Sequence, residues 1–148
     1  FDYTPRADFY GTDTFTYIAS DGVNTSSVAT VTITVNNLPD PPSAVGDSYT
    51  APNDGTPQTF NVVSNDTTDP DPSQTLSITT VTQGTSGGTV TVSGGKIIYT
   101  APIAYLGEDT FIYTIQDDDG LTDSATVTVS VEDASDNVDS SISRLSLS

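Results

Sequence analysis

The chain has 148 residues, with 20 Asp or Glu against three Lys or Arg, and its formal net charge at pH 7 is −17. Such an acidic surface repels nucleic acid and anionic lipid, so we expect no nucleic-acid partner and no direct insertion into a membrane. The absence of Cys and His excludes disulfide bonds, thiolate metal sites and the usual general base of catalysis. A glycosidase-like pair of carboxylates would need a cleft that short loops do not offer, and we expect no enzyme.

Residues 1–35 predict a β-hairpin with one apolar face. Phe15 and Tyr17 alternate with polar residues, which is the period-2 pattern of a half-buried strand, and Asp21-Gly22 is a turn signal. An isolated hairpin is marginally stable in water and too small to bury a core. We therefore interpret residues 1–40 as the C-terminal part of a preceding β-sandwich repeat plus a linker. Its apolar face needs a partner, which a tail strand, a second molecule or the other half of the module could supply.

Residues 41–132 predict one complete module. Seven segments of strand-like composition are separated by turns rich in Gly, Asn and Asp, at the spacing of a Greek-key sandwich. The segments are 44–50, 58–63, 76–82, 88–93, 96–100, 110–117 and 122–131. We expect them to form an antiparallel sandwich, and the expected core includes Phe111, Tyr113, Ile115, Val127 and Val129. The tail, 133–148, is rich in Ser and Asp and is expected to be flexible.

The chain contains an internal repeat. Residues 97–131 align with residues 1–35 without a gap at an offset of 96, so that Phe15 matches Phe111 and Asp21 matches Asp117. A period of this length without helix signals predicts tandem β modules rather than a solenoid of small repeats.

The acidic residues concentrate in loops, and several gather around the expected joint between the modules. Asp40 lies in the linker NNLPDPP, while Asp66, Asp69 and Asp71 lie in the loop NDTTDPDP. Short carboxylates in loops are the ligands that Ca²⁺ prefers, so we expect Ca²⁺ at this joint. An alternative stays open, because Asp-Pro-Asp-Pro also fits a turn without any metal.

The sequence of the hairpin and linker resembles that of a known family. Three segments are similar to the bacterial cadherin-like and VCBS-type tandem repeats of large secreted, RTX-type adhesins. They are YTPRADFYGTDTFTYIASDG, ATVTITVNN and GDSYT. The resemblance covers residues 1–132. It implies an all-β fold of tandem immunoglobulin-like or cadherin-like Greek-key sandwiches, a location outside the cell, and Ca²⁺ at or between the modules.

The resemblance also implies a set of ligands. By position in the family pattern these are Asp69, Asp71, Asp117 and Asp21, the linker residues Asn37, Asp40, Asp133 and Asp136, the lower-end acids Asp13, Glu108 and Asp109, and the first-strand acid Asp54. The chain departs from cadherins because NNLPDPP contains one carboxylate and the D-R-E triplet is absent, so we expect fewer ions per joint. For Asp13 and Asp109 a turn that starts the next strand is an equal alternative, and Asp117 also fits a hairpin turn.

Two functions remain open. The first is a structural repeat of a long surface or secreted adhesin, stiffened by Ca²⁺, with neighbouring repeats of the same chain as partners. The second is a module that binds a polysaccharide or a cell-surface protein. An exposed row of aromatic side chains would favour the second function, whereas buried aromatic residues would favour the first.

Overall fold

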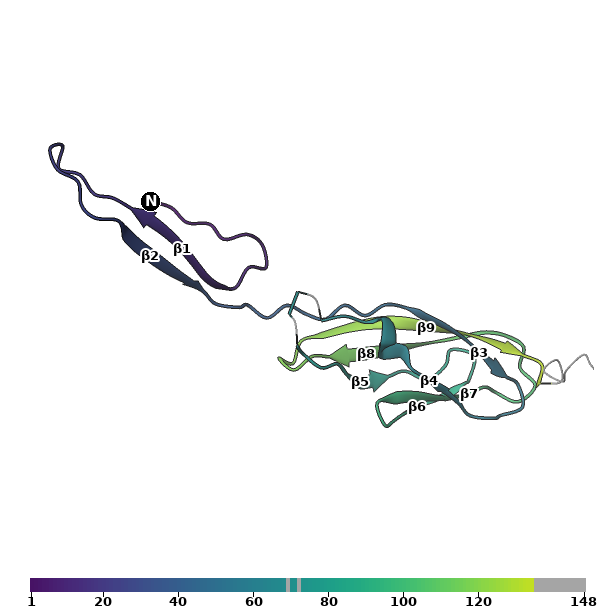
Figure 1. The fold of residues 1–148 in the computed structure, drawn as a ribbon. Helices are drawn as coiled ribbons and strands as arrows, with labels where there is room; N and C mark the ends of the chain where they lie inside the picture. Colours follow the sequence, from purple (N-terminus) through teal and green to yellow (C-terminus); the bar gives the residue numbers. More distant parts are fainter. Residues whose placement is uncertain (69, 72, 135–148) are drawn as a thin grey trace, which may run out of the picture. The chain divides into compact units, whose positions relative to one another are not determined.

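In the computed structural model, which describes residues 1–68, 70, 71 and 73–134, the chain forms two compact units, Phe1–Pro39 and Asp40–Ser148. Figure 1 labels the strands of both units. The described residues are almost all strand, turn or loop, and their one helix is a single 3₁₀ turn, Val62–Asn65 (η1). No helix in this part of the chain has the length and apolar character needed to cross a membrane.

The first unit is a hairpin of β1 (Gly11–Tyr17) and β2 (Ala29–Val35). The strands are antiparallel, and their pairing runs from Gly11 with Val35 to Tyr17 with Ala29. The hairpin of the second unit has the same register at the offset of 96, with Gly107 opposite Val131. The internal repeat read from the sequence is therefore a repeat of backbone structure as well.

The second unit is a sandwich of two sheets with seven strands, as predicted (Figure 1). The four-stranded sheet has the order β3-β9-β8-β5 and the three-stranded sheet has the order β4-β7-β6. The strands are β3 (Asp47–Pro52), β4 (Gln58–Phe60), β5 (Ser77–Val81), β6 (Thr89–Ser93), β7 (Lys96–Thr100), β8 (Gly107–Gln116) and β9 (Thr122–Glu132). The turn between β6 and β7 is Gly94-Gly95, and both residues have positive φ, which is the geometry of a tight hairpin turn.

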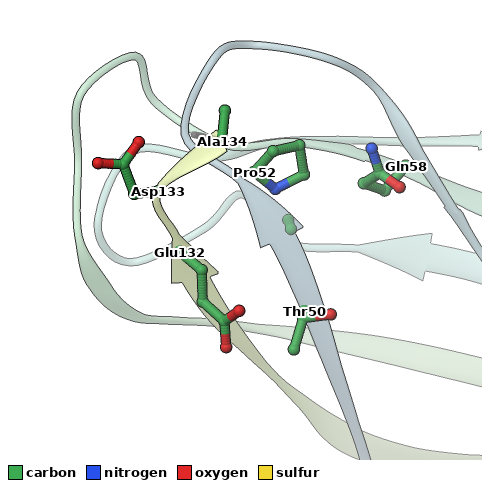
Figure 2. A pocket seen from close by; sticks show the side chains of 7 residues that line it. Thr50, Pro52, Gln58, Glu132, Asp133 and Ala134 are labelled. Carbon is green, nitrogen blue, oxygen red and sulfur yellow. The ribbon is translucent and has the colours of Figure 1, made fainter. Parts of the chain in front are cut away.

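Two details of the predicted strands were wrong. β3 pairs with β9 in parallel, from Asp47 with Val127 to Pro52 with Glu132, so the sandwich is not antiparallel throughout. Figure 2 shows the two arrows pointing the same way at this end of the pair. Alternation of apolar and polar residues is the same in both kinds of pairing, so the pattern could not distinguish them. The predicted strand 58–63 ends at Phe60, and η1 continues from it.

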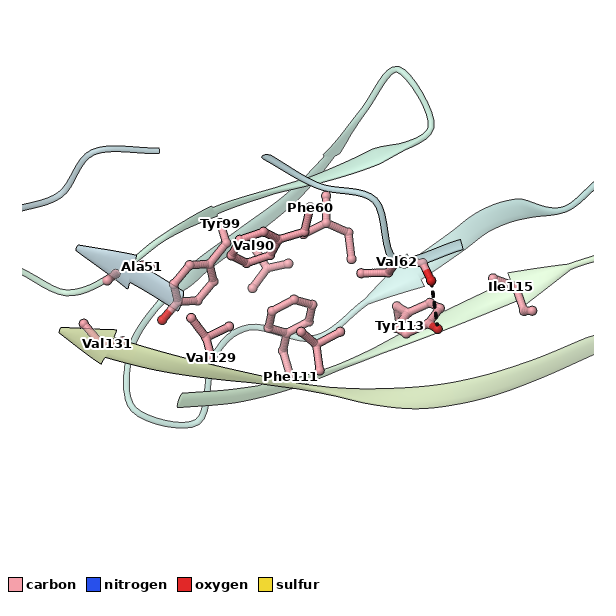
Figure 3. Close-up of a cluster of buried hydrophobic side chains, with 13 residues drawn as sticks. Ala51, Phe60, Val62, Val90, Tyr99, Phe111, Tyr113, Ile115, Val129 and Val131 are labelled. Carbon is pink, nitrogen blue, oxygen red and sulfur yellow. Dashed lines mark hydrogen bonds between the residues drawn. The ribbon is translucent and has the colours of Figure 1, made fainter. Parts of the chain in front are cut away.

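The core lies between the two sheets (Figure 3). The five residues predicted for it are each at most 1% exposed, which confirms that prediction. Four aromatic rings stack in series within this core: Tyr49 on Phe60 at 4.1 Å between centroids, Phe60 on Tyr99 at 5.7 Å, and Tyr99 on Phe111 at 5.9 Å. The series joins β3 and β8 of one sheet to β4 and β7 of the other, so it ties the two layers together.

Candidate functional site

The predicted ligands do not gather at one place. The first unit contains Asp13, Asp21 and Asn37. In the second unit the entry end, where Asp40 begins the unit and β8 turns into β9, has Asp40, Asp66, Asp71 and Asp117. The exit end, where β9 finishes, has Asp54, Glu108, Asp109 and Asp133. Asp69 and Asp136 lie outside the described residues. In the described part of the chain, no three acidic side chains come together closely enough to hold a metal ion.

At the entry end, two predicted ligands hold the backbone of the incoming chain. Asp71 is 2% exposed, and its Oδ2 accepts a hydrogen bond of 2.7 Å from the backbone N–H of Asp40. Asp66 Oδ1 accepts bonds from the N–H of Val45 at 2.7 Å and from the hydroxyl of Tyr113 at 3.0 Å. These carboxylates fix the linker and the start of β3 against the loop before β5.

Asp117 opens the tight turn between β8 and β9. Its side chain is 6% exposed, and Oδ1 accepts hydrogen bonds from the N–H groups of Asp119 at 3.0 Å and Leu121 at 2.8 Å. Asp117 therefore stabilises the hairpin turn, which was one of the two roles predicted for it. The other oxygen, Oδ2, is buried and has no hydrogen-bond partner among the described residues. A buried carboxylate oxygen in that state is costly unless a donor or a cation satisfies it.

A second unsatisfied oxygen belongs to the same group of residues. The amide nitrogen of Gln74 donates to Asp119 Oδ2 at 2.7 Å, and its Oε1 is buried without a partner in the described structure. Asp119 is bonded to both residues, and oxygens without donors, such as these two, are of the type that a hard cation binds. Gln74 was not among the predicted ligands, which were all carboxylates apart from Asn37. Its position just after the Asp-Pro-Asp-Pro loop was the available signal.

A third buried oxygen without a partner belongs to Asp47, which was not predicted as part of any site. Asp47 Oδ2 is buried without a hydrogen-bond partner in the described chain. Burial raises the pKa of Asp47 above its ordinary value, and the negative charge of Asp66 raises it further. Ionisation of Asp47 is therefore less favourable in the folded protein than in an unfolded chain.

We expect Asp47→Asn to stabilise the second unit at pH 7 by about 0.5 kcal/mol, a rise of about 2–4 °C in melting temperature. A raised folded-state pKa means that the parent protein loses stability as the pH rises through that pKa. The difference between Asn variant and parent should therefore shrink as the pH falls to about 4, near the unfolded pKa of Asp. Melting curves followed by circular dichroism at pH 7, 5.5 and 4 test this. A lower melting temperature for the variant at pH 7 would contradict it.

At the exit end, Asp109 is fully buried and surrounded by donors. Its oxygens accept hydrogen bonds from the N–H groups of Ser86 at 2.7 Å, Gly88 at 3.0 Å and Thr110 at 2.9 Å, and from the hydroxyls of Tyr99 at 2.8 Å and Thr85 at 3.3 Å. Burial opposes ionisation of Asp109 most strongly, but the bonds from Ser86, Tyr99 and Gly88 together outweigh it, and its pKa lies below the ordinary value. These donors stabilise the carboxylate without any cation.

Two glycines allow the loop before β6 to approach Asp109. A Cβ at Gly84 would lie 2.1 Å from Asp109 Oδ2, and a Cβ at Gly88 would lie 2.3 Å from the same atom. Neither glycine has a positive φ, so close approach rather than backbone conformation requires glycine here. Asp109 therefore joins β8 to a turn of the form Gly-x-x-x-Gly, and we call Asp109 with residues 84–88 the glycine-turn clamp.

The remaining predicted ligands lie on exposed loops or strands. Asp54 Oδ1 accepts a 2.8 Å bond from the N–H of Thr56 within its own turn, and Asp21 Oδ1 similarly accepts from Val23 and Asn24. Asp133 lines a shallow pocket of about 330 Å³ at the exit end with Thr50, Pro52, Gln58 and Glu132. Figure 2 shows the carboxylates of Glu132 and Asp133 pointing in different directions. The exit end therefore does not present a cage of converging carboxylates in its described part.

The aromatic residues offer no stacking surface on the second unit. Each Phe and Tyr of this unit is buried or half-buried. Exposed aromatic side chains occur on the first unit, where Tyr17 is 51% exposed and Phe1 is 89% exposed.

Comparison with known proteins gives a family and a set of distant structural likenesses. The family model described as "Bacterial Ig domain" matches residues 1–34 and 39–130. No curated protein sequence matches the chain. Among solved structures, a nucleoside hydrolase-related hypothetical protein from Saccharophagus degradans, associated with carbohydrate metabolism, is 15% identical with a TM-score of 0.46. That match covers 65% of this chain and 26% of the other.

Two further solved structures match the chain with lower TM-scores. The endo-fucoidan hydrolase MfFcnA4 from glycoside hydrolase family 107 is 21% identical with a TM-score of 0.37, covering 86% of this chain and 19% of that one. A structure of titin kinase and its flanking domains is 15% identical with a TM-score of 0.34, covering 71% of this chain and 19% of the other. The chain thus spans between 19% and 26% of the length of these structures.

Proposed function

The chain belongs to the bacterial Ig domain family, and we propose that it is a non-catalytic, extracellular structural module of a long bacterial surface or secreted adhesin. Its partners are neighbouring repeats of the same kind. Support comes from the tandem arrangement, in which the same hairpin recurs at an offset of 96 with the same register. The burial of the aromatic residues of the second unit also supports a spacer over a module that binds a polysaccharide or a cell-surface protein.

We further propose that the module binds Ca²⁺ at its entry end. The observation that carries this proposal is the pair of buried, unsatisfied oxygens, Asp117 Oδ2 and Gln74 Oε1. Asp71 and Asp69 belong to the loop that leads into Gln74, and Asp40 is bonded to Asp71. Carbonyl and carboxylate oxygens of this kind are the ligands of Ca²⁺ in proteins, and the basic residue nearest in sequence, Lys96, is in the β6–β7 hairpin.

The ion would act by holding the linker and the β8–β9 turn together. Extracellular modules bind Ca²⁺ with dissociation constants of about 10⁻⁴–10⁻³ M, so the site would fill outside a cell and stay largely empty inside. Bound Ca²⁺ would satisfy the oxygens of Asp117 and Gln74 and offset the repulsion among the carboxylates of the entry end. The linker at Asp40 would then be fixed, and a chain that is loose before export would stiffen afterwards.

The test compares melting temperatures in chelator and in about 10 mM Ca²⁺. At about 100-fold excess over the dissociation constant, the parent should gain about 2.7 kcal/mol per site, or roughly 10 °C or more for a domain of this size. Asp117→Asn keeps the turn-forming Oδ1 but replaces the unsatisfied Oδ2 by an amide, so it should lose most of this shift. The double variant Asp69→Asn with Asp71→Asn should lose it as well.

The matched control is Asp54→Asn, which removes one negative charge from a turn at the exit end. It should keep the full Ca²⁺-dependent shift, because Asp54 lies outside the proposed site. If the shift came from general screening of negative charge, Asp54→Asn and Asp117→Asn would reduce it equally. The calcium proposal fails if the parent shows no shift, or if Asp117→Asn keeps all of it.

A further inference from the structure

The edge strand β6 differs from the other three edge strands of the second unit. β4 is three residues long, β5 has a register shift between Ile78 and Thr80, and β3 ends at Pro52, which has no N–H to donate. Each of these features discourages pairing with another chain. β6 is five residues long and pairs regularly with β7, and its sequence TVTVS contains neither a charge nor a proline (Figure 1).

The side chain of Gln83 covers the middle of the β6 edge. Gln83 Oε1 accepts a hydrogen bond of 2.9 Å from the N–H of Val90, and Gln83 Nε2 donates a bond of 2.9 Å to the C=O of the same residue. A side-chain amide presents an acceptor and a donor together, as the backbone of a neighbouring strand does. The Gln83 amide therefore occupies both groups of Val90 through which another strand would pair.

The backbone around Gln83 is held by the other sheet. The N–H groups of Thr82 and Thr85 donate to carbonyl groups of β8 at 2.9 Å each, so the Gln83 side chain reaches from the four-stranded sheet to the edge of the three-stranded one. The N–H of Gly84 also donates to the C=O of Gly88 at 2.9 Å. The segment before β6 thus covers its edge as far as Val90.

Beyond Val90 the edge is open at Val92. Backbone groups of successive strand residues point to opposite edges, so the N–H and C=O of Val92 point away from β7, as those of Val90 do. Among the described residues, none outside β7 bonds to these two groups. The side chain of Val92 is 42% exposed, although it lies on the same side of the strand as Val90, which is 2% exposed.

The β6 edge is complementary to a second copy of itself. In antiparallel pairing about a two-fold axis at Thr91, Val90 of each copy lies opposite Val92 of the other, and both pairs can exchange two hydrogen bonds. Each pair contains one Val90, so the Gln83 amide blocks both of them. Residues 83–95 contain no charged side chain before Lys96, so the repulsion expected from a net charge of −17 is weakest at this edge.

We infer that Gln83 is an autoinhibitory cap on the β6 edge, and that the edge it closes is a pairing site for β6 of a second copy of this chain. While the amide is bonded to Val90, copies that meet at this edge cannot form the two-fold ladder. Loss of the amide contact opens the ladder along Val90 and Val92. The inference concerns contacts between copies, and it depends neither on calcium nor on the proposed structural role.

The experiment is analytical ultracentrifugation of the full chain from about 10 μM to about 1 mM. The parent should be a monomer throughout. Gln83→Met keeps the length of the side chain but removes both hydrogen-bonding groups, and Gln83→Asn keeps the amide but is one methylene too short to reach Val90. Both variants should form a concentration-dependent dimer, with a dissociation constant at least about tenfold below that of any association of the parent.

Two further variants locate the contact. Thr91 lies on the proposed axis, so adding Thr91→Lys to Gln83→Met places two lysine side chains opposite each other and should restore the monomer. Lysine makes the chain less acidic, so general repulsion between acidic chains would not explain this result. Gln58→Met is the matched control, because Gln58 lies on the edge strand β4 and its amide nitrogen bonds to Thr56 in the preceding turn. It should stay monomeric.

Hydrogen exchange gives a second measurement. In the parent, the amide of Val90 should exchange at least about tenfold more slowly than that of Val92, and in the dimer both should be protected. Equal exchange of the two amides in the monomeric parent would show that the edge is not capped, whether or not the Gln83 variants fold. The inference is also overturned if both Gln83 variants are folded and monomeric, if the dimer persists with Thr91→Lys, or if the parent itself dimerises with a protected Val92 amide.

Discussion

Replacement of Asp109 by Asn should lower the free energy of unfolding of the second unit by about 3 kcal/mol at pH 7. The carboxylate accepts five hydrogen bonds in a fully buried position. In Asn, an NH₂ group replaces one acceptor oxygen, and because this group is itself a donor it cannot accept the hydrogen bonds offered there. Small domains are stable by about 5–15 kcal/mol, so the loss is a large share of the total. Urea denaturation followed by circular dichroism measures it.

The pH dependence of this effect has a definite sign. The pKa of Asp109 is lower in the folded protein than in an unfolded chain, where it is about 3.9. The stabilisation is therefore fully present above about pH 4 and is lost as the pH falls through the folded-state pKa. The difference between parent and Asp109→Asn should accordingly shrink in acid.

Asp13→Asn in the same chain is the matched control for Asp109→Asn. Asp13 is the counterpart of Asp109 in the repeat and also accepts a bond from a Tyr hydroxyl, but it is exposed. We expect no measurable change in the unfolding of the second unit. Equal effects of the two substitutions would show that burial within the glycine-turn clamp is not the source of the stabilisation.

Truncation of Phe111 to Ala should have an effect of similar or greater size, about 3–5 kcal/mol. Phe111 is 1% exposed and ends the series of stacked rings that begins at Tyr49, so its removal leaves a cavity and breaks a ring contact with Tyr99. If the Ala variant is unfolded, Phe111→Leu provides a milder change, with an expected loss of about 1–2 kcal/mol. Urea denaturation of both variants tests the prediction.

Ile112→Ala is the control for Phe111→Ala, because Ile112 is the next residue of β8 and is 46% exposed on the opposite face. Its truncation should cost less than 1 kcal/mol, or about a quarter of the Phe111 effect. A similar cost at both positions would contradict the assignment of one face of β8 to the core.

The sandwich itself could be predicted from the sequence because alternation of apolar and polar residues fixes which face of each strand is buried. Phe111, Tyr113 and Val129 were identified in this way, and all are buried. The parallel pairing of β3 with β9 could not be predicted, since alternation is identical in parallel and antiparallel strands. The 3₁₀ turn after Phe60 was missed because Val62 and Val63 have strand-like composition.

The acidic residues were harder to interpret, because the same side chain serves several purposes. The family resemblance implied that Asp109 and Asp117 are both metal ligands. In the structure the oxygens of Asp109 are matched by donors, whereas Asp117 has an unsatisfied oxygen. The donors to Asp109 include N–H groups of a loop distant in sequence, the Gly84–Gly88 turn, whereas the hydrogen bonds to Asp117 come from its own turn, at Asp119 and Leu121. Local sequence patterns contain no information about which distant loop supplies the donors.

The parallel contact of β3 with β9 also determines how the module responds to mechanical force. The chain enters through β3 at one end of the sandwich and leaves through β9 at the other, and the two strands pair along six positions from Asp47 to Pro52. Pulling the two termini of the module apart slides β3 along β9, so the backbone hydrogen bonds between them are loaded in shear. Bonds loaded together must fail together, whereas bonds pulled open from one end fail singly. The unfolding rate that governs rupture under tension is thus set by this strand pair, which is a property suited to a chain held at both ends.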